Sequence, residues 1–542
     1  MHPDRMLSPK IQANSLKTLV SLAALLVGLG LTSGCQNQSD FDVLVLNGRI
    51  YDGSGTESFK ADIGILDGRI KTIGDLRSKT SKTTIDASGL VVAPGFIDLH
   101  THTERRLLDL PDIQNYTRQG VTTVLGGNCG ASPPRIGDYL RKAEENGIAL
   151  NLALLVGHNS VRSAVMGTEN RHSTPEELEQ MQTLVDQAMH DGAFGLSTGL
   201  LYVPGTYSNT EEVVGLATVA ALHGGIYATH MRNESSQLLE SMDEALHIGR
   251  EANLPVHISH HKAVGKSMWG ASVDSLAKVE TAIQEGLDVT LDQYPYTASS
   301  TTLLVLFPSW ALEGGREKIL ERLKEPAQRA KIKTAIVHNI LNDRGGGDPA
   351  SVVVASYPID ASLEGKNLSE ITQIRGKAPT AENAADTLME LIEAGSGSGI
   401  YHCIDEGDVV RIMNHPLVTC ASDGSTVAFG EARPHPRNYG TYPRVLGHYV
   451  REKGVLPLEE AIRKMTSLPA QRLGIKDRGI IRKAAWADLV LFDPETVIDT
   501  ATWESPHSYP KGIPHVLVNG VAVIKDSEWT GAFPGKSLRH KN

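Results

Sequence analysis

Short apolar runs separated by turn signals mark both ends of the chain. The run 41–46 is followed by Asn47-Gly48, and the run 61–66 is followed by Asp67-Gly68. Asn-Gly and Asp-Gly next to apolar runs are strong signals for β-hairpins. Similar runs return at 487–492, 515–518 and 521–524, the last two separated by Asn519-Gly520. Residues 36–94 and 479–542 are therefore predicted to form one small β-sandwich domain.

The stretch between these ends, residues 95–478, alternates between short apolar runs and segments with helical character. A helix start is indicated at Ser173-Thr174-Pro175-Glu176-Glu177, where a capping residue precedes proline and acidic residues. Eight strand candidates separated largely by helices predict an α/β fold, specifically a (β/α)8 barrel. These candidates lie near 96–99, 121–125, 150–156, 193–197, 225–230, 254–260, 287–293 and 416–422.

One interval in this series is too long for a single barrel helix. No further barrel strand is evident between Thr297 and about Ile400. Residues 297–355 are predicted to be an insertion over the barrel mouth, with Gly314-Gly315 and Gly345-Gly346-Gly347 as candidate hinges. The pattern allows either a lid over the active site or a surface excursion.

Composition narrows the range of partners. A chain of 542 residues exceeds what one hydrophobic core normally serves, which agrees with a large domain plus an accessory domain. The formal net charge of −11 argues against a nucleic-acid partner, because such a partner requires a basic face. The oligomeric state is left open.

The first 35 residues have the pattern of a signal peptide. Arg5, Lys10 and Lys17 precede an apolar run at 19–31, which is too short to span a membrane comfortably. The segment 31–35 ends in Cys35 and is similar to a bacterial lipobox, although Thr32 stands where leucine is usual. We expect either lipidation at Cys35, which would anchor the protein to a membrane, or cleavage to give a soluble periplasmic protein. Both possibilities predict that the protein is exported from the cytoplasm.

His100-Thr101-His102 is the first candidate for metal chemistry. It closes the apolar run that contains Pro94-Gly95-Phe96-Ile97-Asp98. Side chains two positions apart on a strand point to the same face, so both imidazoles are expected at the carboxyl end of a barrel strand, where barrel active sites lie. Imidazole is a common zinc ligand.

Four further candidates follow other predicted strands. Cys129 comes after the run 121–125, and its alternative role is that of a small buried apolar residue. His230 and His260 end two more runs, and each alternatively is a core histidine. Asp423 follows the last strand, where it would either transfer protons or cap a helix.

Taken together, these motifs resemble the amidohydrolase superfamily and, within it, the D-aminoacylases (N-acyl-D-amino-acid deacylases). The resemblance covers nearly the whole chain after the signal segment. Cys129 is its specific part, because many amidohydrolases hold two metals with a carboxylated lysine instead. The motifs are Pro94-Gly-Phe-Ile-Asp-Leu-His-Thr-His, Gly127-Asn-Cys-Gly, Thr229-His-Met-Arg-Asn-Glu, Ile258-Ser-His-His-Lys, Asp292-Gln-Tyr-Pro-Tyr, Ser422-Asp-Gly, His435-Pro-Arg and Gly440-Thr-Tyr-Pro-Arg-Val-Leu-Gly.

The resemblance implies a division of roles among these residues. A tight Zn²⁺ would lie on Cys129, His230 and His260, and a weaker metal position on His100, His102 and Asp423. Asp423 would also be the proton-transfer carboxylate. Lys262, Tyr294 and Arg437 match the positions that bind the α-carboxylate of the substrate, although Lys262 and Arg437 alternatively form surface ion pairs.

The expected activity is zinc-dependent hydrolysis of small N-acyl-D-amino acids to a carboxylate and a free D-amino acid. Two alternatives are a cyclic-amide hydrolase of the dihydroorotase or hydantoinase kind and a non-catalytic binding lipoprotein. One feature departs from the family pattern: the loop between Gly424 and His435 is longer than expected. That loop borders the predicted site, so the preferred side chain is left open.

Overall fold

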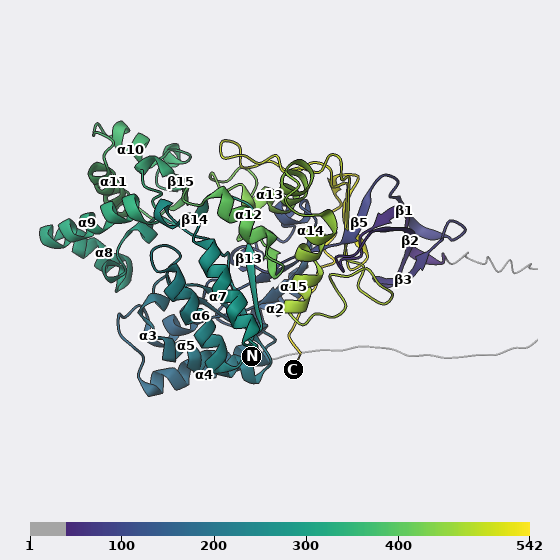
Figure 1. Ribbon diagram of the computed structural model, residues 1–542, viewed down its shortest axis with the longest axis horizontal. Coiled ribbons are helices and arrows are strands. Elements are labelled where there is room, and N and C mark those ends of the chain that lie inside the picture. The colour runs from purple at the N-terminus through teal and green to yellow at the C-terminus, as the bar shows by residue number, and fades with distance from the viewer. Residues whose placement is uncertain (1–38, 542) are drawn as a thin grey trace, which may run out of the picture. The chain divides into compact units, whose positions relative to one another are not determined.

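Eight parallel strand positions form a barrel at the centre of the computed structural model, which describes residues 39–541 (Figure 1). The predicted signal peptide and Cys35 lie outside the described residues. The barrel strands are β6 (Phe96–Asp98), β7 (Val121–Gly126), β8 (Asn151–Leu154) with β9 (Val156–Gly157), β10 (Gly195–Gly199), β11 (Ile226–His230), β12 (Val256–Ile258), β13 (Val289–Gln293) and β17 (Val418–Cys420).

The barrel closes between its first and last strands. The backbone N–H of Asp423 donates to His100 O at 2.8 Å, and Thr101 forms a parallel bridge with Gly424. The buried Asp98 carboxylate adds to this seam, since it accepts the backbone N–H groups of His100 and Ser422. The predicted (β/α)8 barrel is therefore confirmed, and its closure brings the segment after β6 against the segment after β17.

Helices cover the outside of the barrel. The helix α4 begins as predicted, because Thr174 and Glu177 form a reciprocal capping box that satisfies two backbone N–H groups. Its apolar side faces the core through Met181, Val185 and Met189. The helices of this part of the chain are α1 (Gln114–Thr117), α2 (Ile136–Asn146), α3 (His158–Met166), α4 (Pro175–His190), α5 (Thr210–Leu222), α6 (Leu238–Ala252), α7 (Ser272–Gln284), α12 (Glu406–Asn414), α13 (Arg437–Arg444), α14 (Leu458–Met465) and α15 (Ser467–Arg472).

Strands from both ends of the chain pair in one branched sheet. The junction is antiparallel, with Leu489 of β18 opposite Pro94 of β5. The sheet curls so that Arg69 also bridges Trp486, which encloses a second hydrophobic core. Its strands are β1 (Phe41–Ile50), β2 (Phe59–Leu66), β3 (Arg69–Gly74), β4 (Ser81–Asp86), β5 (Val91–Pro94), β18 (Leu489–Phe492), β19 (His515–Val518), β20 (Val521–Lys525) and β21 (Glu528–Trp529).

One of the turn predictions in this domain is wrong. Asp67-Gly68 and Asn519-Gly520 join neighbouring strands with positive φ at both residues, as a tight hairpin requires. Asn47, in contrast, lies inside β1, where the pairing with β2 shifts register. Its backbone N–H donates to Asp62 and its side chain to Asp86, so the left-handed residue makes a bulge that the strand passes through.

The insertion extends further along the chain than the range 297–355 expected from the sequence. Its sheet has the order β14 (Ser299–Thr302), β16 (Ser398–Tyr401), β15 (Val352–Ser356), so the central strand comes last in the chain. The short, Gly- and Ser-rich β16 has little strand signal of its own and is defined by pairing on both sides. The helices α8 (Gly315–Lys324), α9 (Pro326–Asn342), α10 (Leu368–Ile374) and α11 (Ala381–Ala394) gather beside this sheet (Figure 1).

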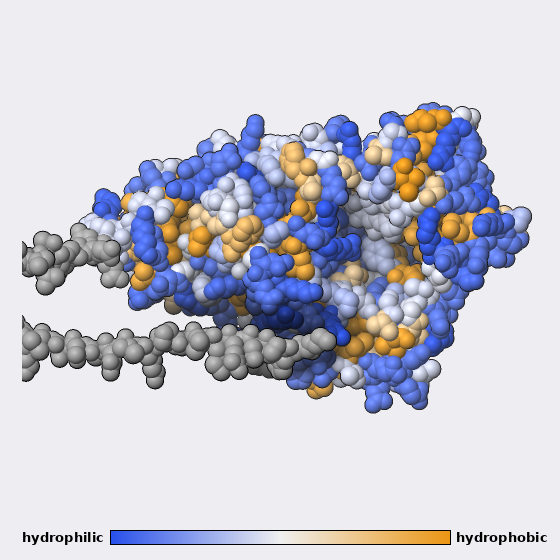
Figure 2. All heavy atoms as spheres, turned by 180° about the vertical axis from the view of Figure 1, so that it is seen from behind, coloured by the Kyte–Doolittle hydropathy of each residue, from blue (hydrophilic) through white to orange (hydrophobic). Residues whose placement is uncertain are grey.

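Within residues 39–541, no helix combines the length and apolar character needed to cross a membrane. On the face shown in Figure 2, hydrophobic residues form separate small patches among hydrophilic ones.

Candidate metal centre and active-site cleft

A cleft of about 540 Å³ opens where the barrel strands end. His102, Cys129, His260 and Asp423 line its floor, and the insertion contributes a wall through β14, β15 and β16. The insertion therefore borders the candidate site, in agreement with its predicted position over the barrel mouth.

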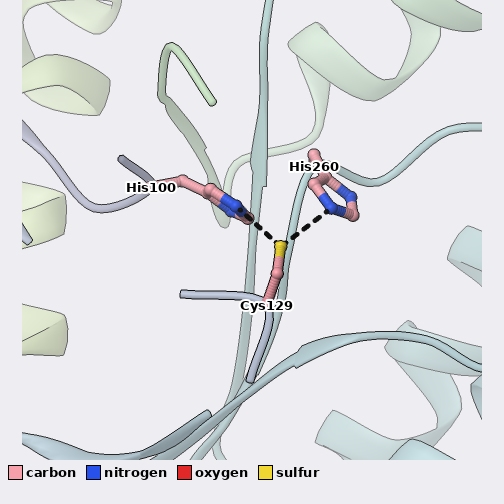
Figure 3. A group of neighbouring side chains, drawn as sticks. All are labelled: His100, Cys129 and His260. Atoms are coloured by element: carbon pink, nitrogen blue, oxygen red, sulfur yellow. Dashed lines mark hydrogen bonds between the residues drawn. The ribbon is translucent and has the colours of Figure 1, made fainter. Parts of the chain in front are cut away.

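Cys129 is the centre of the candidate metal site. Its Sγ lies 3.3 Å from His100 Nε2 and 3.6 Å from His260 Nε2, and the two imidazoles approach the sulfur from different sides (Figure 3). His230 Nδ1 lies 3.7 Å from the same sulfur. These four side chains come from the ends of four barrel strands, as the sequence predicted.

The distances from the Cys129 sulfur match ligand spacing at zinc, and His100, Cys129 and His260 are close enough together to share one ion. With Zn–S near 2.3 Å and Zn–N near 2.0–2.1 Å, neighbouring ligand atoms of a tetrahedral zinc are separated by about 3.5 Å. The observed separations of 3.3 to 3.7 Å between the sulfur and the imidazole nitrogens bracket that value. The residues present therefore fit a zinc ion.

A second group continues from the first through His100. His102 Nε2 lies 3.2 Å from Asp423 Oδ1, and His100 Nε2 lies 3.5 Å from the same oxygen. His100, His102 and Asp423 are all buried and close enough to share a metal ion. The predicted set of His100, His102 and Asp423 is thus one close group. Cys129 is grouped with His100 and His260, and His230 with Glu234 and His260, so the predicted set of Cys129, His230 and His260 is not one close group among the described residues. No helix in residues 39–541 begins at Asp423, so its alternative role as a helix cap is wrong.

Both anionic members of the cluster are stabilised as anions. Burial opposes ionisation of the Cys129 thiol, but His100 and the neighbouring imidazoles outweigh it and lower the pKa well below its ordinary value. Burial also opposes ionisation of Asp423, while Arg437 and His100 hold its pKa well below the usual range. The thiolate is the metal-binding form of cysteine.

Three residues of the cluster have left-handed backbone geometry. The φ angles are 52° at Cys129, 36° at His260 and 49° at Asp423. Such angles are unfavourable for residues with side chains and are concentrated at functional sites. At His260 this geometry also interrupts strand alternation, because β12 ends at Ile258. His257 and His260 are consequently both buried and both bonded to Asp292, which simple alternation does not anticipate.

The three predicted carboxylate binders lie together. Arg437 lies over the Tyr294 ring with its guanidinium carbon 4.7 Å from the ring centre, and Lys262 Nζ is 5.7 Å from that centre. Arg437 is buried and pairs with Asp423 at 2.8 Å, so the alternative of a surface ion pair is wrong for this residue. Arg437 Nε and Tyr294 Oη are buried and have no hydrogen-bond partner among the described residues.

Lys262 is engaged inside the protein. Its ammonium group contacts Glu234 Oε1 at 2.6 Å, His260 Nδ1 at 2.8 Å and His260 O at 2.8 Å. An ammonium group has three N–H donors, and these contacts occupy all of them. Lys262 therefore positions His260 and Glu234 in this structure, and its role in substrate binding stays a prediction.

The sequence analysis assigned no role to four supporting residues. Glu234 contacts His260 Nδ1 at 3.0 Å and is paired with Arg344 of the insertion at 3.0 Å. Asp292 holds His100 Nδ1 at 3.2 Å. His435 accepts the backbone N–H of Arg437 and so positions that residue. Glu234, Asp292 and His435 lie within the motifs that carry the family resemblance, so the sequence offered a sign of their importance. Arg344 lies in none of these motifs.

The Glu234 carboxylate is held as an anion. Burial opposes its ionisation, but Lys262 and the imidazoles of His230 and His260 hold its pKa well below the usual range. The carboxylate thus carries the negative charge that two buried cations and two candidate metal ligands require. Such outer partners fix the orientation of ligand imidazoles in metal sites.

A barrel with histidine, cysteine and aspartate at its strand ends is the arrangement of a metal-dependent hydrolase. A family model for the amidohydrolase family matches residues 83–524, and the chain belongs to that family. It is similar over nearly its whole length to a D-aminoacylase from Alcaligenes xylosoxydans xylosoxydans, with 39% identity covering 93% of this chain and 99% of that protein.

Two solved structures show the same similarity. A crystal structure of D-aminoacylase superposes with a TM-score of 0.79 and 37% identity, covering 92% of this chain and 100% of that one. The N-acyl-D-glutamate deacylase of Bordetella bronchiseptica, complexed with zinc and a phosphonate inhibitor, has a TM-score of 0.79 and 34% identity. That match covers 92% of this chain and 99% of the other.

Proposed function

We propose that this protein hydrolyses the amide bond of N-acyl-D-amino acids, releasing a carboxylate and a free D-amino acid. The observation that carries the proposal is the grouping of Cys129 with three imidazoles beside Asp423 on the floor of the cleft. The similarity to a D-aminoacylase and to a zinc-bound N-acyl-D-glutamate deacylase supports it.

The metal of this site is Zn²⁺. Cys129, His230 and His260 would hold one tight ion, and His100, His102 and Asp423 would hold a second, weaker one. The approach of His230 Nδ1 and His260 Nε2 to the Cys129 sulfur and of His102 Nε2 to Asp423 Oδ1 supports these assignments. Bound zinc polarises an amide carbonyl and lowers the pKa of a coordinated water.

Asp423 is the proton-transfer residue. Its carboxylate faces the cleft and is held as an anion, so it can accept the proton that the attacking water loses. It then delivers that proton to the departing nitrogen, which leaves as the amine of the D-amino acid. Arg437 fixes the carboxylate from the other side, with Nη1 2.8 Å from Oδ2.

Arg437 and Tyr294 bind the α-carboxylate of the substrate, and Lys262, whose donors are engaged by Glu234 and His260, adds positive charge beside them. The unpartnered Arg437 Nε and Tyr294 Oη among the described residues are buried donors that a carboxylate would satisfy. A carboxylate held at this point places the neighbouring amide near Asp423, because Arg437 contacts both. The acyl group and side-chain preference are set by the rest of the cleft.

Purified protein supplied with zinc should release free amino acid from N-acetyl-D-amino acids and not from their L-enantiomers. The panel includes apolar and acidic side chains, and hydantoins and dihydroorotate test the cyclic-amide alternative. Release of D-amino acids without ring opening supports the proposal. An absence of D-selective release across the panel overturns it, and ring opening alone establishes the alternative.

We also propose that the protein is exported. The basic residues, apolar run and Cys35 of the first 35 residues support this proposal. Cell fractionation of the full chain should find it outside the cytoplasm, and labelling with a radioactive fatty acid should be lost in Cys35→Ala if Cys35 is lipidated. Recovery from the cytoplasm contradicts export, while unlabelled periplasmic protein indicates simple cleavage.

A further inference from the structure

A second group of metal-binding side chains lies outside the cleft. Asp186 and His190 are one helical turn apart on the last part of α4, and His223 directly follows α5. These two helices lie side by side (Figure 1) and pack against each other. Each ends a few residues before a barrel strand, α4 before β10 and α5 before β11. The cleft opens where strands end, so this group lies at the opposite end of the barrel.

The three side chains converge on one point. His223 Nε2 lies 2.8 Å from Asp186 Oδ1, and His190 Nε2 lies 3.7 Å from Asp186 Oδ2. The two imidazole rings are 4.7 Å apart between centres and nearly perpendicular, at 82°. One ligand atom from each residue lies within 4.8 Å of the other two, so the three side chains are near enough to surround one ion.

Burial differs among the three residues in a way that suits a binding site. The His223 side chain is 9% exposed and is fixed in place, whereas those of His190 and Asp186 are 60% and 51% exposed. A cation can therefore reach the group from solvent, and water can fill its remaining coordination positions. The backbone is unstrained here, because none of the three residues has positive φ.

The helix ends favour a cation at this place. Carbonyl groups at the carboxyl end of a helix give it a partial negative charge, and the ends of α4 and α5 meet beside the three side chains. Two imidazoles and one carboxylate form a ligand set that suits Zn²⁺ and related divalent transition metals. The strongly hydrated Mg²⁺, in contrast, prefers oxygen ligands.

We propose that Asp186, His190 and His223 bind a divalent transition-metal ion of the Zn²⁺ class, separate from the cleft. The ion bridges α4 and α5. It also lies near the C-terminal segment, since the backbone N–H of His540 donates to Gly192 O just after α4. Metal at this site therefore stabilises the fold by binding the native state, without taking part in the reaction.

Cobalt separates this site from the one at Cys129. Co²⁺ bound by a thiolate gives a strong near-ultraviolet charge-transfer band, whereas Co²⁺ on nitrogen and oxygen ligands gives visible bands alone. During titration of the metal-free full chain, absorbance and dialysis should show one ion, beyond any held by His100, His102 and Asp423, that adds visible absorption without thiolate charge transfer and that is lost in His190→Ala. The melting temperature should rise further as this ion binds.

His190→Ala and Asp186→Asn test the assignment, and His247→Ala is the matched control. His247 is an exposed histidine on α6 and belongs to no candidate metal group of residues 39–541. Each test variant should bind the sulfur-free ion at least about tenfold more weakly and leave the hydrolytic rate unchanged. His247→Ala should match the parent chain. Parent-like binding by both test variants, or no sulfur-free ion in the parent chain, overturns the proposal.

Discussion

Two groups of histidine and acidic side chains lie at opposite ends of the same barrel. The cleft cluster, centred on Cys129, is buried and surrounded by further charged partners such as Glu234 and Asp292. The outer group of Asp186, His190 and His223 is half open to solvent. Both can hold a metal, yet only the cleft cluster has donors and a carboxylate facing a cavity.

The difference shows what distinguishes a reactive site from a binding site in this fold. Left-handed angles at Cys129, His260 and Asp423 cost of order 1–3 kcal/mol each, and they persist only where surrounding structure fixes them. The outer group is on ordinary helix ends and carries no such cost. Strained backbone and buried supporting charges therefore accompany the proposed catalytic site, while the proposed outer metal site has neither.

The largest difference should appear when the same substitution is made in both groups. Asp423→Asn removes the carboxylate proposed to transfer protons and should lower kcat by about 10²–10⁴-fold, the usual contribution of a positioned acid–base group. Asp186→Asn should leave kcat unchanged. Steady-state kinetics with an N-acetyl-D-amino acid measure both, and metal analysis shows whether Asp423→Asn retains the tight ion. A kcat near the parent value in Asp423→Asn contradicts its role.

The ligand positions of the cleft cluster could be predicted because each follows an apolar run. A barrel places every strand end at one rim, so His100, Cys129, His230, His260 and Asp423 had to lie near one another once eight strands were recognised. Their supporting contacts could not be predicted in the same way. Arg344 reaches Glu234 from the insertion, 110 positions along the chain, and no local pattern encodes that pairing.

The sequence did not reveal how far the insertion extends, and it gave no sign of the outer group. The strand β16 is specified by antiparallel pairing with β14 and β15, which are distant in the chain, rather than by its own residues. Asp186 and His223 are on separate helices, where ordinary helix patterns give no sign of convergence. Position after a buried strand is thus readable from sequence, while contact between distant elements requires the folded structure.

An intermediate effect should follow from removing the charge of Glu234. Glu234→Gln keeps the shape of the side chain but leaves Lys262 and Arg344 buried without their anion. Breaking such a buried pair typically costs about 3–5 kcal/mol in stability, and loss of a partner of a ligand imidazole weakens metal binding about 10–100-fold. Denaturant unfolding and zinc titration measure the two effects.

Glu240→Gln is the control for this prediction, because Glu240 is exposed on α6. Its free energy of unfolding should change by no more than about 0.5 kcal/mol. If Glu234→Gln behaves like Glu240→Gln in both measurements, the buried carboxylate does not support the metal ligands. Supporting charge would then not distinguish the cleft cluster from the outer group.

The smallest expected change tests the contact between substrate and cleft. Arg437→Lys keeps the charge but loses the planar fork that can grip a carboxylate with two bonds, so KM should rise about tenfold. Because Arg437 also holds Asp423, kcat should fall as well, by less than in Asp423→Asn. Arg433→Lys, at an exposed position in the loop just before α13, should change neither constant. If Arg437→Lys keeps the parent KM, the substrate carboxylate does not bind at Arg437. The buried Arg437 Nε, which has no partner among the described residues, would then not be explained by the substrate.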